Sequence, residues 1–544
     1  MKLYSPAPQR CAILLGILAC FVSIGTAQNV TSNAACERLT QLKVPNASIT
    51  LAQTVPAGTY SGPAEVFTGR DLSRLYKSLP AFCRVEVTAK PTSDSDIKIA
   101  VWIPLNGWNG RFQGFGNGGF AGLIDYGQIA SAVKLGYAAS ATDDGHSGSP
   151  GDAAWAVGHP EKVIDFGYRG IHEMTRVSKI IIQSFYGSPA RHSYFAGCSD
   201  GGREALMEAQ RYPEDYDGIL AGDPANNWVP LISLGVYDAQ ALTVGPRSYI
   251  PPAKLPSISA AVNAACDEFD GVRDGILNDP RQCHFDPATI ECKTGEDSDK
   301  CLTAPQVAAM KKIYAGLPDS SGHIIFPGYL PGAEDAPGGW SLWITGPAPN
   351  GSLNYQLGNS FYAYFVHYRA DWDYKTFTVE KDEKLAEDAL GRQLDASDPD
   401  LKPFASRGGK LVMYHGWNDP AIPALNSVNY FESVRAKLGA KATDSFLRLY
   451  MVPGMLHCSG GPGADAFGQV GLFTDTDSGA NLRLSLQQWT EVGTAPGPII
   501  ASKRDRADWQ HVIMTRPLCP YPQAATYRGT GDTTNAANFA CTEK

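Results

Sequence analysis

The stretch that decides the fold is Ser193–Arg211, SYFAGCSDGGREALMEAQR. Its first five residues predict a short strand, and the run from Gly201 predicts a helix that stops near Pro213. Between them lies Gly197-Cys198-Ser199-Asp200-Gly201, which fits the pattern G-x-S-x-G. A sharp strand-to-helix turn lifts the serine hydroxyl above the sheet, and small residues on either side avoid clashes. We therefore predict that Ser199 is a nucleophile; the alternative is a chance glycine turn, in a chain with 56 glycines.

Strand and helix patterns alternate on both sides of this turn. Such alternation indicates an α/β fold with a parallel, doubly wound sheet. The expected strands are Ile97–Ile103, Arg111–Gly114, Tyr137–Thr142, Tyr216–Gly222, Lys410–His415 and Phe446–Val452, and the expected helices include Val163–Tyr186, Ala424–Leu438 and Leu482–Val492.

The alternation breaks after Trp228. Residues 229–405 are rich in Pro, Gly, Tyr and Trp and hold four closely spaced cysteines. We interpret them as an inserted lid domain that covers the active end of the sheet. The expected organisation is a signal peptide at 1–27, an α/β-hydrolase catalytic domain made of 28–228 and 406–544, and the lid at 229–405.

A serine nucleophile needs a histidine base and a carboxylate that orients the histidine. On an α/β-hydrolase sheet they follow in the order Ser, Asp/Glu, His, from loops after later strands. Asp419 follows the strand Lys410–His415, and His457 follows the strand Phe446–Val452, so both are predicted members of the triad. His415 is the main rival base, and its plainer role is a buried histidine that supports the Asp419 loop. His146, His159 and His192 precede the serine and do not fit the order.

The glycine-rich run Gly116-Asn117-Gly118-Gly119 follows an early predicted strand. Glycines let a backbone amide approach a ligand closely. We expect an oxyanion hole made by the amide of Asp200 and that of Gly118 or Gly119, with an ordinary glycine turn as the alternative.

The first residues are typical of a secretory signal. Lys2 and Arg10 precede the apolar run Cys11–Ile24, and Gly25-Thr26-Ala27 supplies the small residues of a cleavage site. The alternative, a membrane anchor, needs roughly 20 apolar residues, more than this run has. The formal net charge is −9 without a basic block, so nucleic acid is not an expected partner and neither is a membrane. We expect an extracellular protein.

Cysteine usage agrees with export, because an even number of cysteines remains beyond the signal. If Ser199 and His457 lie within hydrogen-bond reach, the adjacent Cys198 and Cys458 fall within the roughly 4.4–6.8 Å between Cα atoms that a disulfide needs. Order and spacing suggest the other pairs, Cys36–Cys83, Cys266–Cys283, Cys292–Cys301 and Cys519–Cys541. Sequons at Asn29, Asn46 and Asn350 are candidate glycosylation sites.

Carboxylates gather at short intervals in the run from Cys266 to Ile276. Calcium takes six to eight oxygen ligands from carboxylates and carbonyls. The spacing departs from that of an EF-hand, so a solvated acidic loop held by a disulfide is an equal alternative on this evidence. The candidate ligands are Asp267, Asp270 and Asp274 with the carbonyls of Val272 and Ile276.

Taken together, Cys198-Ser199, Asp419 and His457-Cys458 resemble the mark of the tannase and feruloyl esterase family. The resemblance covers nearly the whole chain after the signal. It implies an α/β-hydrolase fold with a large lid, a disulfide between the two cysteines, and a structural Ca²⁺ site in the lid at the acidic run. It also implies hydrolysis of phenolic-acid esters, on plant polysaccharide or on small molecules, without an organic cofactor.

Feruloyl (hydroxycinnamoyl) and galloyl esters both suit this family. The resemblance favours a feruloyl esterase over a tannase, because fungal tannases are often cleaved at a dibasic site in the lid and the only such pair here is Lys311-Lys312, in a helix-like stretch. A secreted peptidase and a non-catalytic binding protein are the rival functions. The sequence indicates no oligomeric state. Candidate ring contacts for the acyl group are Tyr355, Phe361, Tyr362 and Tyr364, with core packing as their alternative fate.

Overall fold

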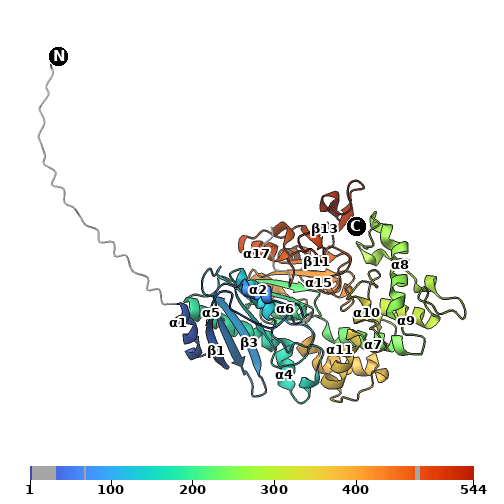
Figure 1. Ribbon diagram of the computed structural model, residues 1–544, viewed down its shortest axis with the longest axis horizontal. Helices are drawn as coiled ribbons and strands as arrows, with labels where there is room; N and C mark the ends of the chain where they lie inside the picture. Colours follow the sequence, from blue (N-terminus) through green and yellow to red (C-terminus); the bar gives the residue numbers. More distant parts are fainter. Residues whose placement is uncertain (3–31, 67–68, 472–477, 506, 544) are drawn as a thin grey trace.

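The computed structural model describes residues 1–2, 32–66, 69–471, 478–505 and 507–543 (Figure 1). The predicted signal cleavage site and the sequon at Asn29 lie outside the described residues. Within the described residues, no helix combines the length and the apolar character that crossing a membrane requires.

A nine-stranded mixed sheet forms the centre of the molecule, in the order β1-β2-β3-β5-β4-β6-β7-β10-β11. The strands from β5 to β11 along this order run parallel, as predicted for the part of the chain that carries the site. The strands are β1 (Ala47–Val55), β2 (Phe82–Ala89), β3 (Ile97–Pro104), β4 (Arg111–Phe115), β5 (Ala138–Thr142), β6 (His192–Cys198), β7 (Gly218–Gly222), β10 (Lys410–Gly416) and β11 (Leu447–Val452).

The first part of the sheet differs from the parallel prediction. β1, β2 and β3 pair in antiparallel register, and β3 joins β5 antiparallel as well. The link from β2 to β3 spans only residues 90–96, which suits a hairpin, whereas a parallel pair needs a crossover of a dozen or more residues.

Helices cover both faces of the sheet, so the doubly wound prediction is confirmed. Among the longer helices of the described residues, three share an apolar core with one face and two share a core with the other. The first set is α5 (Gly170–Tyr186), α6 (Asp200–Arg211) and α15 (Leu425–Leu438), and the second is α3 (Tyr126–Lys134) and α17 (Leu482–Val492). The predicted helix Val163–Tyr186 is divided into α4 (Pro160–Ile164), a π-helical turn at Asp165–Arg169, and α5.

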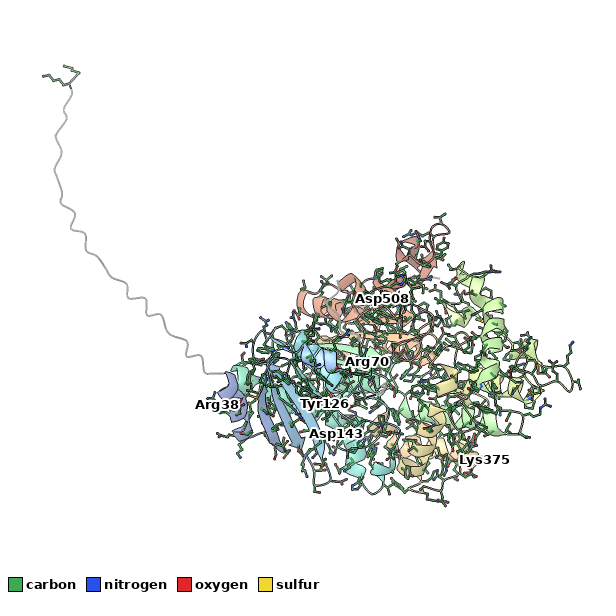
Figure 2. The ribbon with its side chains drawn as sticks, viewed as in Figure 1. Arg38, Arg70, Tyr126, Asp143, Lys375 and Asp508 are labelled. Atoms are coloured by element: carbon green, nitrogen blue, oxygen red, sulfur yellow. A yellow bond between two sulfur atoms is a disulfide. The ribbon has the colours of Figure 1, made fainter. Side chains whose placement is uncertain are left out.

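The segment between β7 and β10 lies beside the sheet, at the right of Figure 1. Its larger helices are α7 (Trp228–Thr243), α8 (Leu255–Cys266), α9 (Ala304–Ala315) and α11 (Leu353–Phe361), with the short α10 (Trp340–Trp343) between the last two. Figure 2 places Lys375 of this segment and Arg38 of the N-terminal region at opposite ends of the molecule.

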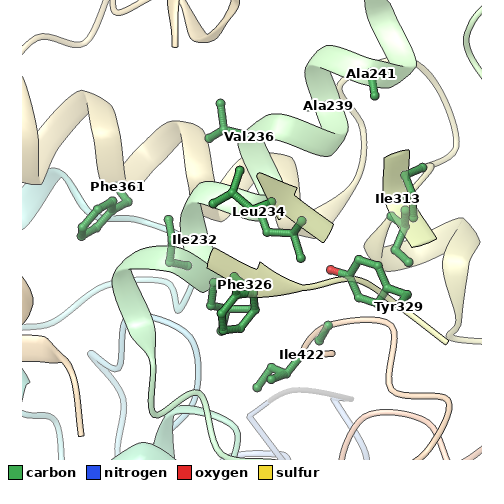
Figure 3. Packing of buried hydrophobic residues seen from close by; sticks show 14 of the residues in the cluster. Ile232, Leu234, Val236, Ala239, Ala241, Ile313, Phe326, Tyr329, Phe361 and Ile422 are labelled. Atoms are coloured by element: carbon green, nitrogen blue, oxygen red, sulfur yellow. The ribbon is translucent and has the colours of Figure 1, made fainter. Parts of the chain in front are cut away.

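The inserted segment shares its core with loops of the sheet. Phe120, Phe166 and Ile422 belong to the same buried cluster as the apolar side chains of α7 and α9. Figure 3 shows part of this cluster, including Ile232, Phe326 and Ile422. Because the two parts bury apolar surface against one another, the inserted segment is held against loops that follow the strands. That it acts as a lid stays a prediction. Its boundaries at 229 and 405 stay a prediction.

Five disulfides join the ten cysteines of the described residues. Cys198–Cys458 has a Cα–Cα distance of 6.0 Å and links segments 260 residues apart. The others are Cys36–Cys83, Cys266–Cys283, Cys292–Cys301 and Cys519–Cys541, the pairs expected from order and spacing.

Candidate active site

Ser199 occupies the sharp turn between β6 and α6. Its φ of 67° and ψ of −123° are unfavourable for a residue with a side chain, at a cost of about 1–3 kcal/mol. The surrounding backbone fixes it: the Ser199 amide donates to the Gly222 carbonyl at 3.0 Å, and its carbonyl accepts from the amide of Ala225 at 3.1 Å. A Cβ on Gly201 would lie 2.8 Å from the Asn117 carbonyl oxygen, which explains why the residue two positions after the serine is a glycine.

Asp419 and His457 meet where two neighbouring parallel strands end. β10 leads into the Asp419 loop and β11 into the His457 loop, and His457 Nδ1 lies 2.8 Å from Asp419 Oδ2. The other carboxylate oxygen accepts from the amides of Ala421 at 2.7 Å and Ile422 at 2.9 Å. The Asp419 side chain is fully buried, whereas that of His457 is 10% exposed. The carboxylate is therefore fixed, and the imidazole keeps a small exposed surface.

The electrostatics suit an ionised aspartate beside a basic histidine. Burial raises the pKa of Asp419, but the charges of His457 and His415 and their hydrogen bonds lower it more, so it lies well below its usual range. Burial lowers the pKa of His457, and the charge of Asp419 with its hydrogen bond outweighs this and raises it. The arrangement favours a positive imidazolium, the form that a general base acquires when it takes a proton.

The Cys198–Cys458 disulfide holds the residues next to it, Ser199 and His457, on neighbouring backbones. The Trp343 ring packs against the His457 ring at 5.1 Å and lines the same pocket as Ser199. Among the described residues, no hydrogen bond joins Ser199 Oγ to His457 Nε2, and that ring nitrogen has no other partner. Ser199 thus lines the pocket, and the Cys198–Cys458 disulfide and Trp343 place His457 beside it, in contact with Asp419.

The glycine-rich loop after β4 is tied to the nucleophile helix. The Asn117 amide donates to Glu204 Oε2 at 2.8 Å, and the Asn117 carbonyl accepts from the Gly201 amide at 2.9 Å. Of the two candidate oxyanion glycines, Gly119 lines the pocket with Ser199 and Asp200, whereas Gly118 lines a separate small cavity. The geometry therefore favours Gly119 over Gly118 as the second donor.

The pocket beside Ser199 has apolar walls. α7 and α11 of the inserted segment form one side, and the loop after Asp419 forms another. Among the described lining residues, Asn354 is the only one beyond Ser199 and Asp200 with an amide, hydroxyl or charged side chain. The lining residues are Gly119, Ser199, Asp200, Ala225, Trp228, Leu231, Ile232, Gly235, Trp343, Asn354, Leu357, Ala421 and Ile422.

The four aromatic residues expected to hold an acyl ring lie elsewhere. Phe361 and Tyr362 are fully buried in the core of the inserted segment, and Tyr355 and Tyr364 pack against that core. They are not among the residues that line the pocket. Trp228 and Trp343 are the aromatic residues that line it, and neither has a local sequence signal of that position.

The acidic loop brings its carboxylates close together without closing a cation site. Burial raises the pKa of Asp270 to about 6, and the charges of Asp274 and Asp267 add to the rise. Asp274 Oδ2 accepts from Arg516 at 2.6 Å, and both Asp267 oxygens accept from the Gly275 amide at 3.0 Å. The described clusters whose ligating atoms all lie within 4.8 Å of one another do not include this loop. The carbonyl candidates Val272 and Ile276 belong to buried residues of the same loop.

The chain is similar to a known protein family, to individual relatives and to solved structures. A family model described as tannase and feruloyl esterase matches residues 83–542. The chain is 38% identical to an uncharacterized esterase of Xanthomonas campestris, over 98% of this chain and 95% of that one. It is 33% identical to a probable feruloyl esterase B of Aspergillus clavatus, over 97% of this chain and 99% of that one. The crystal structure of feruloyl esterase B from Aspergillus oryzae is similar with a TM-score of 0.85 at 29% identity, over 94% of this chain and 100% of that one.

Proposed function

The chain belongs to the tannase and feruloyl esterase family of carboxylic ester hydrolases, and from this membership we propose that it hydrolyses feruloyl (hydroxycinnamoyl) esters of plant cell-wall polysaccharides through an acyl-enzyme on Ser199. The observation that carries the proposal is that Ser199 lines an apolar pocket with Trp343, whose ring packs against His457, while Asp419 lies in contact with His457 Nδ1. Family membership leaves the non-catalytic alternative without support.

The mechanism that fits this geometry is two-step acyl transfer. His457 Nε2 takes the Ser199 proton as the hydroxyl attacks the ester carbonyl, while Asp419 holds the imidazole by its Nδ1. The amides of Asp200 and Gly119 stabilise the oxyanion. His457 then returns the proton to the leaving alcohol, and a water activated by the same histidine releases the phenolic acid and frees Ser199.

The walls of the pocket favour a feruloyl over a galloyl group. A galloyl ring carries three phenolic hydroxyls, and each one buried without a partner costs about 1–3 kcal/mol. A feruloyl ring carries one hydroxyl and a methoxy group on a longer, apolar acyl chain. Trp228, Leu231, Ile232 and Leu357 offer apolar contact to such a chain. The Asn354 NH₂ group already donates to Tyr329 and to the Pro420 carbonyl, which leaves its Oδ1 to accept from a single hydroxyl.

Parallel hydrolysis of methyl ferulate and methyl gallate tests the substrate. We expect kcat/KM on methyl ferulate to exceed that on methyl gallate by at least about tenfold, a difference of 1.4 kcal/mol. A clear preference for gallate would assign the chain to the tannases instead. The Ser199→Ala variant should fold and lose hydrolysis of both esters, and casein should not be cleaved, which separates an esterase from a peptidase.

The acidic loop is proposed to bind a structural Ca²⁺. Its donor set consists of hard oxygens, and the burial and neighbouring carboxylate charges that raise the pKa of Asp270 are conditions that a bound cation offsets. Asp267, Asp270 and Asp274, with the carbonyls of Val272 and Ile276, would hold the ion. The Cys266–Cys283 disulfide fixes the ends of the loop, so the ion would stabilise the inserted segment and not act on the ester.

Secretion and glycosylation complete the proposal. Five disulfides are typical of a protein that folds in an oxidising compartment. Asn46 and Asn350 are both exposed, with φ of 56° and 62°, in turns that leave the amide side chain free for modification. We propose that the chain is exported and that these sequons carry glycans in a eukaryotic host.

A further inference from the structure

Behind the Asp419–His457 pair lies a second histidine that the proposed triad does not use. His415, the second-last residue of β10, is fully buried. Its Nε2 lies 3.0 Å from the Ile422 carbonyl and 3.3 Å from Asp419 Oδ2, the same oxygen that His457 contacts. Its Nδ1 lies 2.7 Å from Ser427 Oγ on α15. The ring is therefore held on both nitrogens, with one of them aimed at the carboxylate that orients the base.

A second buried carboxylate lies near the same nitrogen of this imidazole. Asp223, in the turn after β7, has a φ of 36° and no exposure. Its Oδ1 accepts from the Gly416 amide at 2.7 Å and lies 3.7 Å from His415 Nε2. Its Oδ2 accepts from the Cys458 amide at 2.8 Å, next to His457. Asp223 thus connects the end of β10, which carries His415, to the loop that carries His457 and Cys458.

Two buried carboxylates this close cannot both stay ionised without a counter-charge. Ligating oxygens of Asp223 and Asp419 and a nitrogen of His415 all lie within 4.8 Å of one another. Like charges at such a distance in a buried site drive one carboxyl to keep its proton. A protonated Asp419 would no longer stabilise the imidazolium that forms on His457, so the reaction needs the proton kept off Asp419.

We propose that His415 is a positioning residue of the active site: its imidazolium, whose Nε2 lies near both Asp223 and Asp419, compensates the second carboxylate and holds Asp419 ionised against His457. The inference rests on the proposed triad. The charged groups that face His415 are Asp223 after β7 and Asp419 after β10, and His457 after β11 lies beyond Asp419. Together they form one array of two carboxylates and two imidazoles.

The array predicts opposite pH shifts for two variants. The acid limb of the kcat/KM profile reports the pKa of the free base, His457. His415→Gln keeps an N–H donor but removes the positive charge, so the Asp419–His457 pair keeps its protons to higher pH and the limb should move up by at least about half a pH unit. Asp223→Asn removes a negative charge and should move the limb down, and the double variant should return toward the wild-type limb.

The experiment is a pH–rate series with p-nitrophenyl acetate, so that it does not depend on the choice of phenolic acid. We expect His415→Gln to lower kcat about 10–100-fold with KM within about twofold. The matched control is His367→Gln, because His367 also contacts a buried aspartate, Asp382, at 2.9 Å but lies in the inserted segment. The control should leave both kcat and the limb unchanged.

The outcomes separate a positioning role from a structural one. A lower Tm and a lower kcat in His415→Gln, with the acid limb at the wild-type pH, would overturn the inference. His415 would then only stabilise the loop that follows β10. If His415→Gln does not fold, Asp223→Asn decides alone, since it keeps His415, and an unshifted limb there also refutes the array. Retained activity in Ser199→Ala would instead refute the triad itself.

Discussion

His457 Nδ1 lies 2.8 Å from Asp419 Oδ2, and the other oxygen of the same carboxylate accepts two backbone amides. Both oxygens of the aspartate are thus held, Oδ1 by two amides and Oδ2 by His457. With the carboxylate fully buried, its orientation is set by the fold before any substrate arrives. The histidine is consequently held in the tautomer that presents Nε2 to the pocket.

Replacing Asp419 with Asn should disable the base while leaving the fold almost intact. The Asn side chain can still accept from the amides of Ala421 and Ile422, but its NH₂ group would face His457 Nδ1 and favour the wrong tautomer. We expect kcat to fall about 10³–10⁴-fold at neutral pH. Stopped-flow or steady-state ester hydrolysis measures this directly.

The control for that variant is Asp388→Asn, an exposed carboxylate that pairs with Lys384 on the inserted segment. Its activity should equal that of the wild type. An Asp419→Asn enzyme within tenfold of the wild type would mean that another carboxylate orients the base.

The Cys198–Cys458 disulfide should matter more to catalysis than to solubility or secretion. It closes a separation of 260 residues, for which chain entropy predicts a loss of roughly 5 kcal/mol when the bond is removed, less any native strain. The bond also sets the distance between the turn that carries Ser199 and the loop that carries His457. We therefore expect the Cys198→Ala/Cys458→Ala variant to lose kcat at least about 100-fold at temperatures where it is folded.

A second double variant, Cys292→Ala/Cys301→Ala, isolates the catalytic effect. That bond closes a separation of only 9 residues in the inserted segment. Its loss should lower Tm modestly with kcat within twofold. Equal losses of kcat in both variants would show that the effect is general instability.

The triad and its strands were predictable because each depends on a local signal. The turn around Ser199 needs glycines at 197 and 201. Asp419 and His457 each follow a short apolar strand in a fixed order. β1 and β2 were missed, although the burial of Phe82–Ala89 alternates as a half-buried strand does. The mixed N-terminal composition concealed a period of two that was present in the sequence.

The pocket walls and the array behind the triad depended on tertiary packing. The aromatic run near Tyr362 is buried because α11 packs against α7. Nothing in its local sequence distinguishes such a buried run from aromatic residues that line a binding pocket. Asp223 had a visible signal, an acidic residue directly after a buried strand. Its partners, Gly416 and Cys458, are about 200 residues away or more, so sequence spacing alone did not reveal what it bonds.

Calcium removal tests the acidic loop. If the loop binds Ca²⁺, dialysis against EGTA should lower Tm by several degrees, since a ligand at about 100 times its Kd stabilises by about 2.7 kcal/mol. Added Ca²⁺ should restore it, with kcat at 25 °C within twofold throughout. Asp270→Asn should abolish the Ca²⁺ dependence of Tm. A wild-type Tm that is the same in EGTA and in Ca²⁺ would contradict the site.

Asp238 should make stability fall as pH rises. It lies on α7, is 2% exposed, and neither carboxylate oxygen has a hydrogen-bond partner among the described residues. Burial raises its pKa well above the ordinary value of 3.8. The folded state therefore keeps a proton that the unfolded chain loses above that value. This contribution to stability is complete below pH 3.8 and is lost progressively as pH rises toward the folded pKa.

Asp238→Asn is neutral at every pH and removes that dependence. At pH 4 the variant and the wild type should have a similar Tm, whereas at pH 8 the variant should be more stable, by up to about 1.4 kcal/mol for each pH unit that the folded pKa is raised. Differential scanning calorimetry at pH 4, 6 and 8 measures the difference. The control is Asp371→Asn, whose side chain is 81% exposed beside Arg369 and should leave the pH dependence unchanged. A Tm difference that stays constant from pH 4 to pH 8 would show that Asp238 does not titrate on unfolding in this range, and that its burial is compensated by a charge or a water in the core.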